Sequence, residues 1–193
     1  MATIQIAQEP DADKVLSESP FALLTGMLLD QQYPMEHAFR GPAKILERFG
    51  SIDAKKIADA DPEQFAALCS EPPAIHRYPG SMSARVQALA QQVVDEYDGQ
   101  AERIWTEATS GADLMKRLQA LPGFGKQKAQ IFTALVAKQL GLRPEGWEKA
   151  AGDYAEAGSF RSVADVVDAD SLARVRAFKQ QKKAAQKQQA LKK

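Results

Sequence analysis

Apolar residues recur along most of the chain at helical intervals, and glycine, proline, aspartate and serine interrupt the pattern. Apolar positions three and four residues apart are typical of amphipathic helices, whereas alternating apolar positions are typical of strands. We therefore predict an all-α fold. The predicted helical segments cover residues 20–32, 34–41, 42–50, 51–60, 61–70, 83–97, 111–121, 126–141 and 168–186.

The segment "PFALLTGMLLDQQ", residues 20–32, differs from the others because apolar residues cover most of its helical surface. A helix that is apolar on all sides is buried. The segment ends in the polar residues Asp30, Gln31 and Gln32, which we expect to emerge from the core. Further along, the Gly41–Pro42 pair predicts a break between two short helices, because proline interrupts a helix interior.

The sequence "LPGFG", residues 121–125, predicts a tight turn between two helices. Gly123 and Gly125 allow a sharp backbone turn and leave amide groups open beside the next helix N-terminus, where the helix dipole favours an anion. Lys126 and Lys128 add positive charge. Such a turn can hold a phosphate of a nucleic-acid backbone, although a simple αα-hairpin explains the same residues.

Acidic and basic residues balance over the 193-residue chain, but they are distributed unevenly. Residues 179–193 contain six lysines and no acid, so residues 1–178 carry six more acidic than basic residues. This excludes a globally basic nucleic-acid-binding surface, and any DNA binding requires a local patch. The lysine-rich end either adds non-specific attraction to phosphates or is a solvated, frayed helix end.

The residue content also excludes several classes of protein and site. The sequence has no run of about 18–20 apolar residues, which a membrane helix requires, and its N-terminus lacks a secretory signal pattern. One cysteine, Cys69, cannot hold an iron–sulfur cluster, and His37 and His76 have no further ligands at metal-binding spacing. We therefore expect a cytoplasmic monomer that has no metal or other cofactor and makes no membrane contact.

The context of the turn, "LMKRLQALPGFGKQKAQIFTAL", resembles the helix-hairpin-helix element of the HhH-GPD base excision DNA repair superfamily. "FALLTGMLLDQQ" and "PGSMSARVQALAQQVV" are similar to helices that precede the hairpin in this family. The resemblance implies two helical lobes and a small bacterial-type member without an iron–sulfur cluster. It divides the chain into an N-terminal extension (1–19), a glycosylase-like domain (20–165) and a C-terminal helix with a Lys/Gln-rich tail (166–193).

The resemblance implies that double-stranded DNA is the partner and that a damaged base is removed from it. Family members with lyase activity place a lysine two residues after the second hairpin glycine, and here this residue is Gln127. Because glutamine cannot form a Schiff base, we expect a monofunctional DNA glycosylase, similar through its Gln-Gln pair to the alkylated-base members. The alternatives are a non-catalytic module that binds distorted or abasic duplex, and a hairpin that mediates only protein contacts.

The resemblance also assigns site residues. Counting from Leu121 places the family's catalytic acid at Glu145, whereas the first aspartate after the Gly/Pro-rich loop is Asp153. We expect Asp153 to be the acid, with Glu145 or no acid as alternatives. The expected DNA-binding residues are Gly123, Phe124, Gly125, Lys126, Lys128, Gln31 and Gln32. Tyr33, His76, Trp147 and Tyr154 either line the base pocket or pack in the core or a lid.

Overall fold

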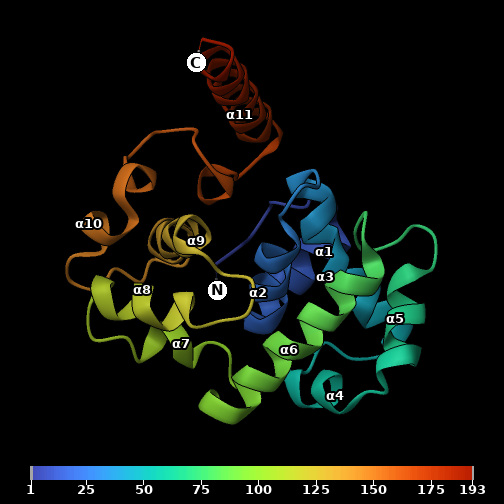
Figure 1. Ribbon diagram of the computed structural model, residues 1–193. Helices are drawn as coiled ribbons and strands as arrows, with labels where there is room; N and C mark the ends of the chain where they lie inside the picture. The colour runs from blue at the N-terminus through green and yellow to red at the C-terminus, as the bar shows by residue number, and fades with distance from the viewer. Residues whose placement is uncertain (1, 193) are drawn as a thin grey trace.

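The computed structural model describes residues 2–192, and all regular structure in this range is helical. The prediction of an all-α fold is confirmed. Figure 1 shows two lobes, one formed by the first half of the chain and one by the second. No helix in residues 2–192 combines the length and the apolar character that crossing a lipid bilayer requires.

Each lobe is organised around one helix. The first contains α1 (Pro10–Glu18), α2 (Pro20–Leu29), α3 (Met35–Phe49), α4 (Ala54–Asp59), α5 (Pro62–Ser70) and α6 (Pro79–Tyr97). The second contains α7 (Arg103–Thr106), α8 (Gly111–Gln119), α9 (Lys126–Gln139), α10 (Trp147–Ala151), η1 (Gly152–Ala155), η2 (Val163–Asp165) and α11 (Ala169–Ala190). In the first lobe α2 packs on α1, α3 and α6; in the second, α9 packs on α8, α10, η1 and η2.

Helix α2 lies at the centre of the first lobe and also reaches the second. Every residue from Phe21 to Leu29 is buried, as the apolar pattern predicts. Ser19 caps the helix by accepting a hydrogen bond from the Ala22 amide at 3.1 Å. At its C-terminal end, Leu28 lies against the turn between α8 and α9. The helix therefore forms part of the contact between the lobes.

The predicted break at Gly41–Pro42 is wrong, because α3 runs without interruption from Met35 to Phe49. A proline inside a helix removes one main-chain hydrogen bond. Here both Gly41 and Pro42 are buried, and a Cβ atom on Gly41 would lie 2.5 Å from Leu29 Cδ1 of α2. The close packing of α3 on α2 outweighs the local preference of proline.

Residues before α2 contribute to the core of the first lobe. Ile4 and Ile6 are fully buried, and the Ile4 amide donates to Ser17 Oγ of α1 at 2.9 Å. Arg40 Nε of α3 donates to the Ala7 carbonyl at 2.9 Å. This segment is thus packed into the lobe, while the division of the chain into an extension and a domain stays a prediction.

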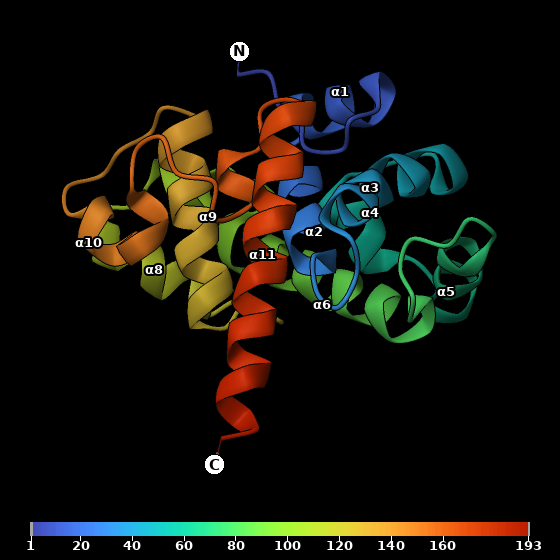
Figure 2. The ribbon, with the colours of Figure 1, turned by 90° about the horizontal axis from the view of Figure 1, so that it is seen from above.

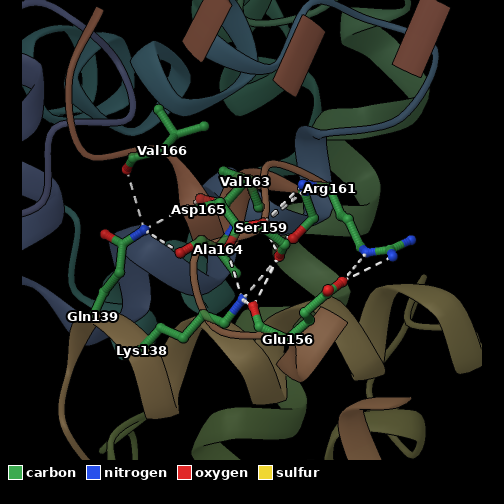
Figure 3. A network of polar contacts seen from close by, with 10 residues as sticks. Lys138, Gln139, Glu156, Ser159, Arg161, Val163, Ala164, Asp165 and Val166 are labelled. Carbon is green, nitrogen blue, oxygen red and sulfur yellow. Dashed lines mark hydrogen bonds and ion pairs between the residues drawn. The ribbon is translucent and has the colours of Figure 1, made fainter. Parts of the chain in front are cut away.

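A polar network fixes the segment between η1 and α11 on the C-terminal half of α9 (Figure 3). Lys138 Nζ donates to Asp165 Oδ1 at 2.6 Å and to the Glu156 carbonyl at 2.8 Å. The side-chain amide of Gln139 donates to three carbonyl groups of segment 163–166. Because the Lys138 and Asp165 side chains are largely buried, this network fixes η2 on α9, and α11 packs on η2.

Helix α11 lies across the junction of the two lobes, as the view from above shows (Figure 2). Three residues near its start are buried, and from residue 180 onward the described side chains are exposed. Arg176 forms an ion pair with Glu36 of α3, and Lys179 Nζ lies 3.8 Å from Met35 Sδ. Since α11 also packs on η2, it contacts both lobes.

We expect Lys138→Met to lower the free energy of unfolding by about 2–4 kcal/mol, because the Asp165 carboxylate would stay buried without its ammonium partner. Chemical denaturation followed by circular dichroism measures this loss. Lys14→Met is the matched control, since the Lys14–Glu18 pair is exposed and such pairs contribute about 0–1 kcal/mol. Equal losses in the two variants would contradict the structural role of the network.

Candidate functional site

The turn between α8 and α9 is held against α2. Gly123 has a φ of +76°, which glycine adopts without strain, and a Cβ atom here would lie 2.6 Å from Leu28 Cδ1. The Phe124 side chain is buried, and its ring packs edge-on against Phe132 with 6.3 Å between centroids. Phe124 therefore anchors the turn with its side chain and leaves only its main chain to face a ligand.

Gly125 and Lys126 form the exposed edge of this turn. Gly125 is the N-cap residue of α9, and within the described chain no side chain caps this helix. Open space surrounds the position that a Gly125 Cβ atom would occupy. Because the first amide groups of a helix lack partners within it, this edge offers N–H groups and the Lys126 ammonium to an anion.

A cavity of 740 Å³ lies where the two lobes and α11 meet. This volume is within the range of about 300–1,000 Å³ that is typical of small-molecule sites. The end of α2 and the loop after it, the first half of α9, η1 and α11 all contribute to its wall. Of the residues singled out from the sequence, those that line it are Gln32, Tyr33, Gln127, Lys128 and Tyr154.

His76 does not line the cavity, but its side chain binds the loop between α2 and α3. It is buried; its Nδ1 accepts the Tyr78 amide at 3.1 Å, and its Nε2 lies 2.8 Å from the Gln31 carbonyl oxygen. Since Nδ1 accepts, Nε2 carries the proton and donates. Burial lowers the pKa of His76 below its usual value, although the Gln31 carbonyl acts in the opposite direction. The His76 side chain therefore connects the Gln31 carbonyl with the Tyr78 amide.

Lys128 holds the same loop from the side of α9. Its Nζ donates to the Leu28 carbonyl at 2.9 Å and lies 3.4 Å from Gln31 Oε1. Burial lowers the pKa of Lys128 to about 8, while Asp30 raises it and Arg85 lowers it further. Lys128 is thus engaged inside the junction of the lobes, whereas Lys126 is exposed at the hairpin.

Aromatic side chains contribute to the cavity wall from three elements. Tyr154 of η1 accepts a hydrogen bond from Gln127 Nε2 of α9 at 3.0 Å. Tyr33, in the loop after α2, packs against His76 with 4.8 Å between ring centroids and an angle of 42° between the ring planes. Phe178 of α11 is the third aromatic residue in the lining. These rings offer apolar faces on which a planar base can stack.

Two carboxylates line the cavity, Asp30 and Glu36, and the sequence assigned a catalytic role to neither. Glu36 is buried; its Oε1 pairs with Arg176, and its Oε2 has no hydrogen-bond partner among the described residues. Burial raises the pKa of Asp30, while Lys179 and Lys128 act in the opposite direction. The only signal for Asp30 in the sequence was its place at the polar end of an apolar helix.

The predicted acids lie outside the cavity lining. Asp153 is exposed on η1, and Glu145 is exposed before α10, where its carbonyl accepts the Gly111 amide at 2.7 Å. Trp147 is buried in the apolar core and does not line the cavity. In residues 2–192 no group of three or more His, Cys, Asp and Glu side chains could hold a metal ion. A catalytic role for Asp153 stays a prediction.

We expect Gly123→Ala to lower the free energy of unfolding by about 1–3 kcal/mol, because alanine at positive φ is strained and its methyl group would collide with Leu28. Gly125→Ala is the matched variant. Gly125 has a φ of −77°, so its replacement should cost at most about 1 kcal/mol. Thermal denaturation compares the two, and a more destabilising Gly125→Ala would contradict the packing of the turn on α2.

We expect Lys128 to titrate at a pH of about 8. Its folded-state pKa lies below the ordinary value of about 10.4, so the unfolded chain binds more protons between these values. The contribution of Lys128 to stability therefore rises with pH across this window. NMR of protein labelled with 13C at lysine Cε measures the titration, and Lys128→Gln identifies the signal. A midpoint above about 10 would contradict the buried environment.

The chain matches one family model, that of the HhH-GPD superfamily base excision DNA repair protein, over residues 25–193. The match begins within α2 and includes the hairpin and the whole cavity wall. No curated protein and no solved structure matches the chain. The helical two-lobed architecture, with the turn at Gly123 and Gly125 beside the cavity, agrees with this assignment. The chain belongs to the HhH-GPD superfamily of base excision DNA repair proteins.

Proposed function

We propose that this protein is a monofunctional DNA glycosylase, which hydrolyses the N-glycosidic bond of a damaged base flipped out of double-stranded DNA. The observation that carries this proposal is the cavity beside the hairpin, whose wall contains Gln127 at the position of the family's lyase lysine. Gln127 donates to Tyr154 and offers no amine to the sugar. The products are therefore a free base and an intact abasic site.

Base removal from a duplex requires a phosphate anchor, a group that fills the gap in the base stack, and a pocket for the extruded base. The exposed edge at Gly125 and Lys126 supplies the anchor. Gln32 supports the second role because it is exposed, with a φ of +53°, in the loop beside the cavity. The aromatic faces of Tyr33 and Tyr154 provide stacking surfaces inside the cavity.

Within the family, the Gln31–Gln32 pair and the missing lysine favour an alkylated base as the substrate. A protein that acts as a monomer is also supported, because one chain supplies both the hairpin and the full cavity wall. In this proposal residues 20–165 form the catalytic unit. The helix that follows adds a basic surface beside it, since Lys179, Lys182 and Lys183 also line the cavity.

A second candidate function is a non-catalytic module that recognises distorted or abasic duplex. One observation favours it: Asp153 and Glu145, the two acids that the family resemblance indicates, are exposed and do not line the cavity. Such a module would use the same hairpin and the same loop at Gln32. It would bind an abasic duplex more tightly than an intact duplex and would release no base.

The test is the release of free base from duplexes that each carry one alkylated, deaminated or oxidised base, followed by mass spectrometry. We expect release from an alkylated duplex and tight binding of an abasic duplex. Tight abasic binding without any release would support the non-catalytic module. The absence of both would contradict every function that involves damaged DNA.

We also expect no covalent complex when the protein and an abasic duplex are mixed with borohydride, because this reagent traps only a Schiff base formed by an amine. Lys128→Gln is the control variant, because the Lys128 amine is in the cavity wall and could form a Schiff base. Gel electrophoresis of the reaction shows trapping directly. A trapped complex in the native protein that disappears in Lys128→Gln would identify a lyase and contradict the monofunctional assignment.

A further inference from the structure

Asp30, an acid far in the sequence from the expected acids Asp153 and Glu145, lines the cavity. Asp30 directly follows α2, and its amide donates to the Gly26 and Met27 carbonyls at 3.1 and 3.3 Å. Its side chain lines the cavity together with Gln127 and Lys128 of α9. We propose that Asp30 is the catalytic carboxylate of this protein. This inference rests on the proposed glycosylase function and names the residue that carries it.

The backbone around Asp30 is held in place from both lobes. On its N-terminal side α2 is buried from Phe21 to Leu29, and Lys128 Nζ donates to the Leu28 carbonyl. On its C-terminal side the Gln31 carbonyl accepts a hydrogen bond from His76 Nε2. A catalytic group is effective when the fold fixes its position before the substrate arrives. Asp30 meets this condition.

The Asp30 carboxylate is also free to act. Among the described residues no hydrogen bond to its oxygens is formed, although the cations Lys128 and Lys179 lie near enough to influence its charge. Glu36, the other acid in the cavity wall, is held by Arg176 and is buried. Of the two acids in the cavity wall, Asp30 is therefore the one whose carboxylate has no ion pair among the described residues.

Its role follows from the charge that develops in the reaction. The bond between C1′ and the base nitrogen breaks, its electron pair leaves with the base, and positive charge appears on the sugar ring. A fixed carboxylate stabilises that charge. Water then forms the new bond to C1′, and the proton it loses passes through Asp30 to the anionic leaving base. For a base that was positively charged, the proton passes to solvent instead.

The first test measures binding, so that it does not depend on identifying the lesion. The probes are a duplex with a cationic pyrrolidine in place of one deoxyribose and a duplex with the neutral tetrahydrofuran analogue. Since transition-state analogues bind more tightly than substrates, we expect the native protein to prefer the pyrrolidine duplex by at least about 10-fold. Asp30→Asn should remove this preference and leave the affinity for the tetrahydrofuran duplex unchanged.

Asp153→Asn and Glu145→Gln are the matched controls, and both should retain the preference. The proposal is overturned if Asp30→Asn keeps the preference, if either control loses it, or if the native protein shows none. Thermal denaturation checks the fold of each variant. Asparagine has nearly the shape of aspartate and no charge to bury, so we expect Asp30→Asn to remain folded.

The second test is base release from the duplex on which the native protein acts. We expect Asp30→Asn to lower the single-turnover rate by at least about 100-fold, whereas Asp59→Asn, at an exposed acid outside the cavity lining, should release base at nearly the native rate. Native release that persists in Asp30→Asn would overturn this inference and leave the glycosylase function intact. A native protein that releases no base from any lesion contradicts the glycosylase function itself.

Discussion

The ammonium group of Lys128 and the C-terminal end of α2 form the contact on which the rest of the site depends. The last carbonyl groups of a helix have no partners within it and carry partial negative charge. Here the Leu28 carbonyl receives its hydrogen bond from Lys128, which is separated from it by 100 positions in the sequence. One buried cation therefore completes a helix of the first lobe from a helix of the second.

This contact places the hairpin next to the cavity wall. Lys128 lies in the first turn of α9, and the hairpin directly precedes that helix. Gly123 allows the turn to approach Leu28 closely, so the turn and Lys128 contact the same part of α2. The edge at Gly125 and the cavity wall at Asp30 are consequently connected by contacts with the end of α2. A phosphate held at the hairpin has a defined position relative to the cavity.

Much of the fold could be predicted from the sequence, because helical periodicity and capping are local. The buried α2, the helix that Asp61 caps at Gln64 and the hairpin at Gly123 all follow from neighbouring residues. The continuity of α3 through Pro42 could not be predicted, because it depends on packing against Leu29. Local patterns describe what a segment prefers, and tertiary contacts decide the remaining cases.

The site was less predictable for the same reason. Gln127 was identified from its position after the hairpin and Tyr154 as an aromatic candidate for the base pocket, and the structure brings them together. Asp30 and Glu36 carry no motif of their own, and they enter the cavity wall only because α9 and α11 cover them. Trp147 illustrates the opposite case, since this aromatic candidate for the base pocket begins α10 and is buried in the core.

The position of α11 has a consequence for how the protein meets DNA. The acidic excess lies in residues 1–178, whereas the exposed end of α11 is basic and lies beside the cavity. The basic side chains Lys179, Lys182 and Lys183 of this helix lie in the cavity wall, so positive charge is concentrated there although residues 1–178 carry an acidic excess. In the proposed function, the end of α11 is the part of the surface that attracts the phosphates of an approaching duplex, and it lies beside the cavity.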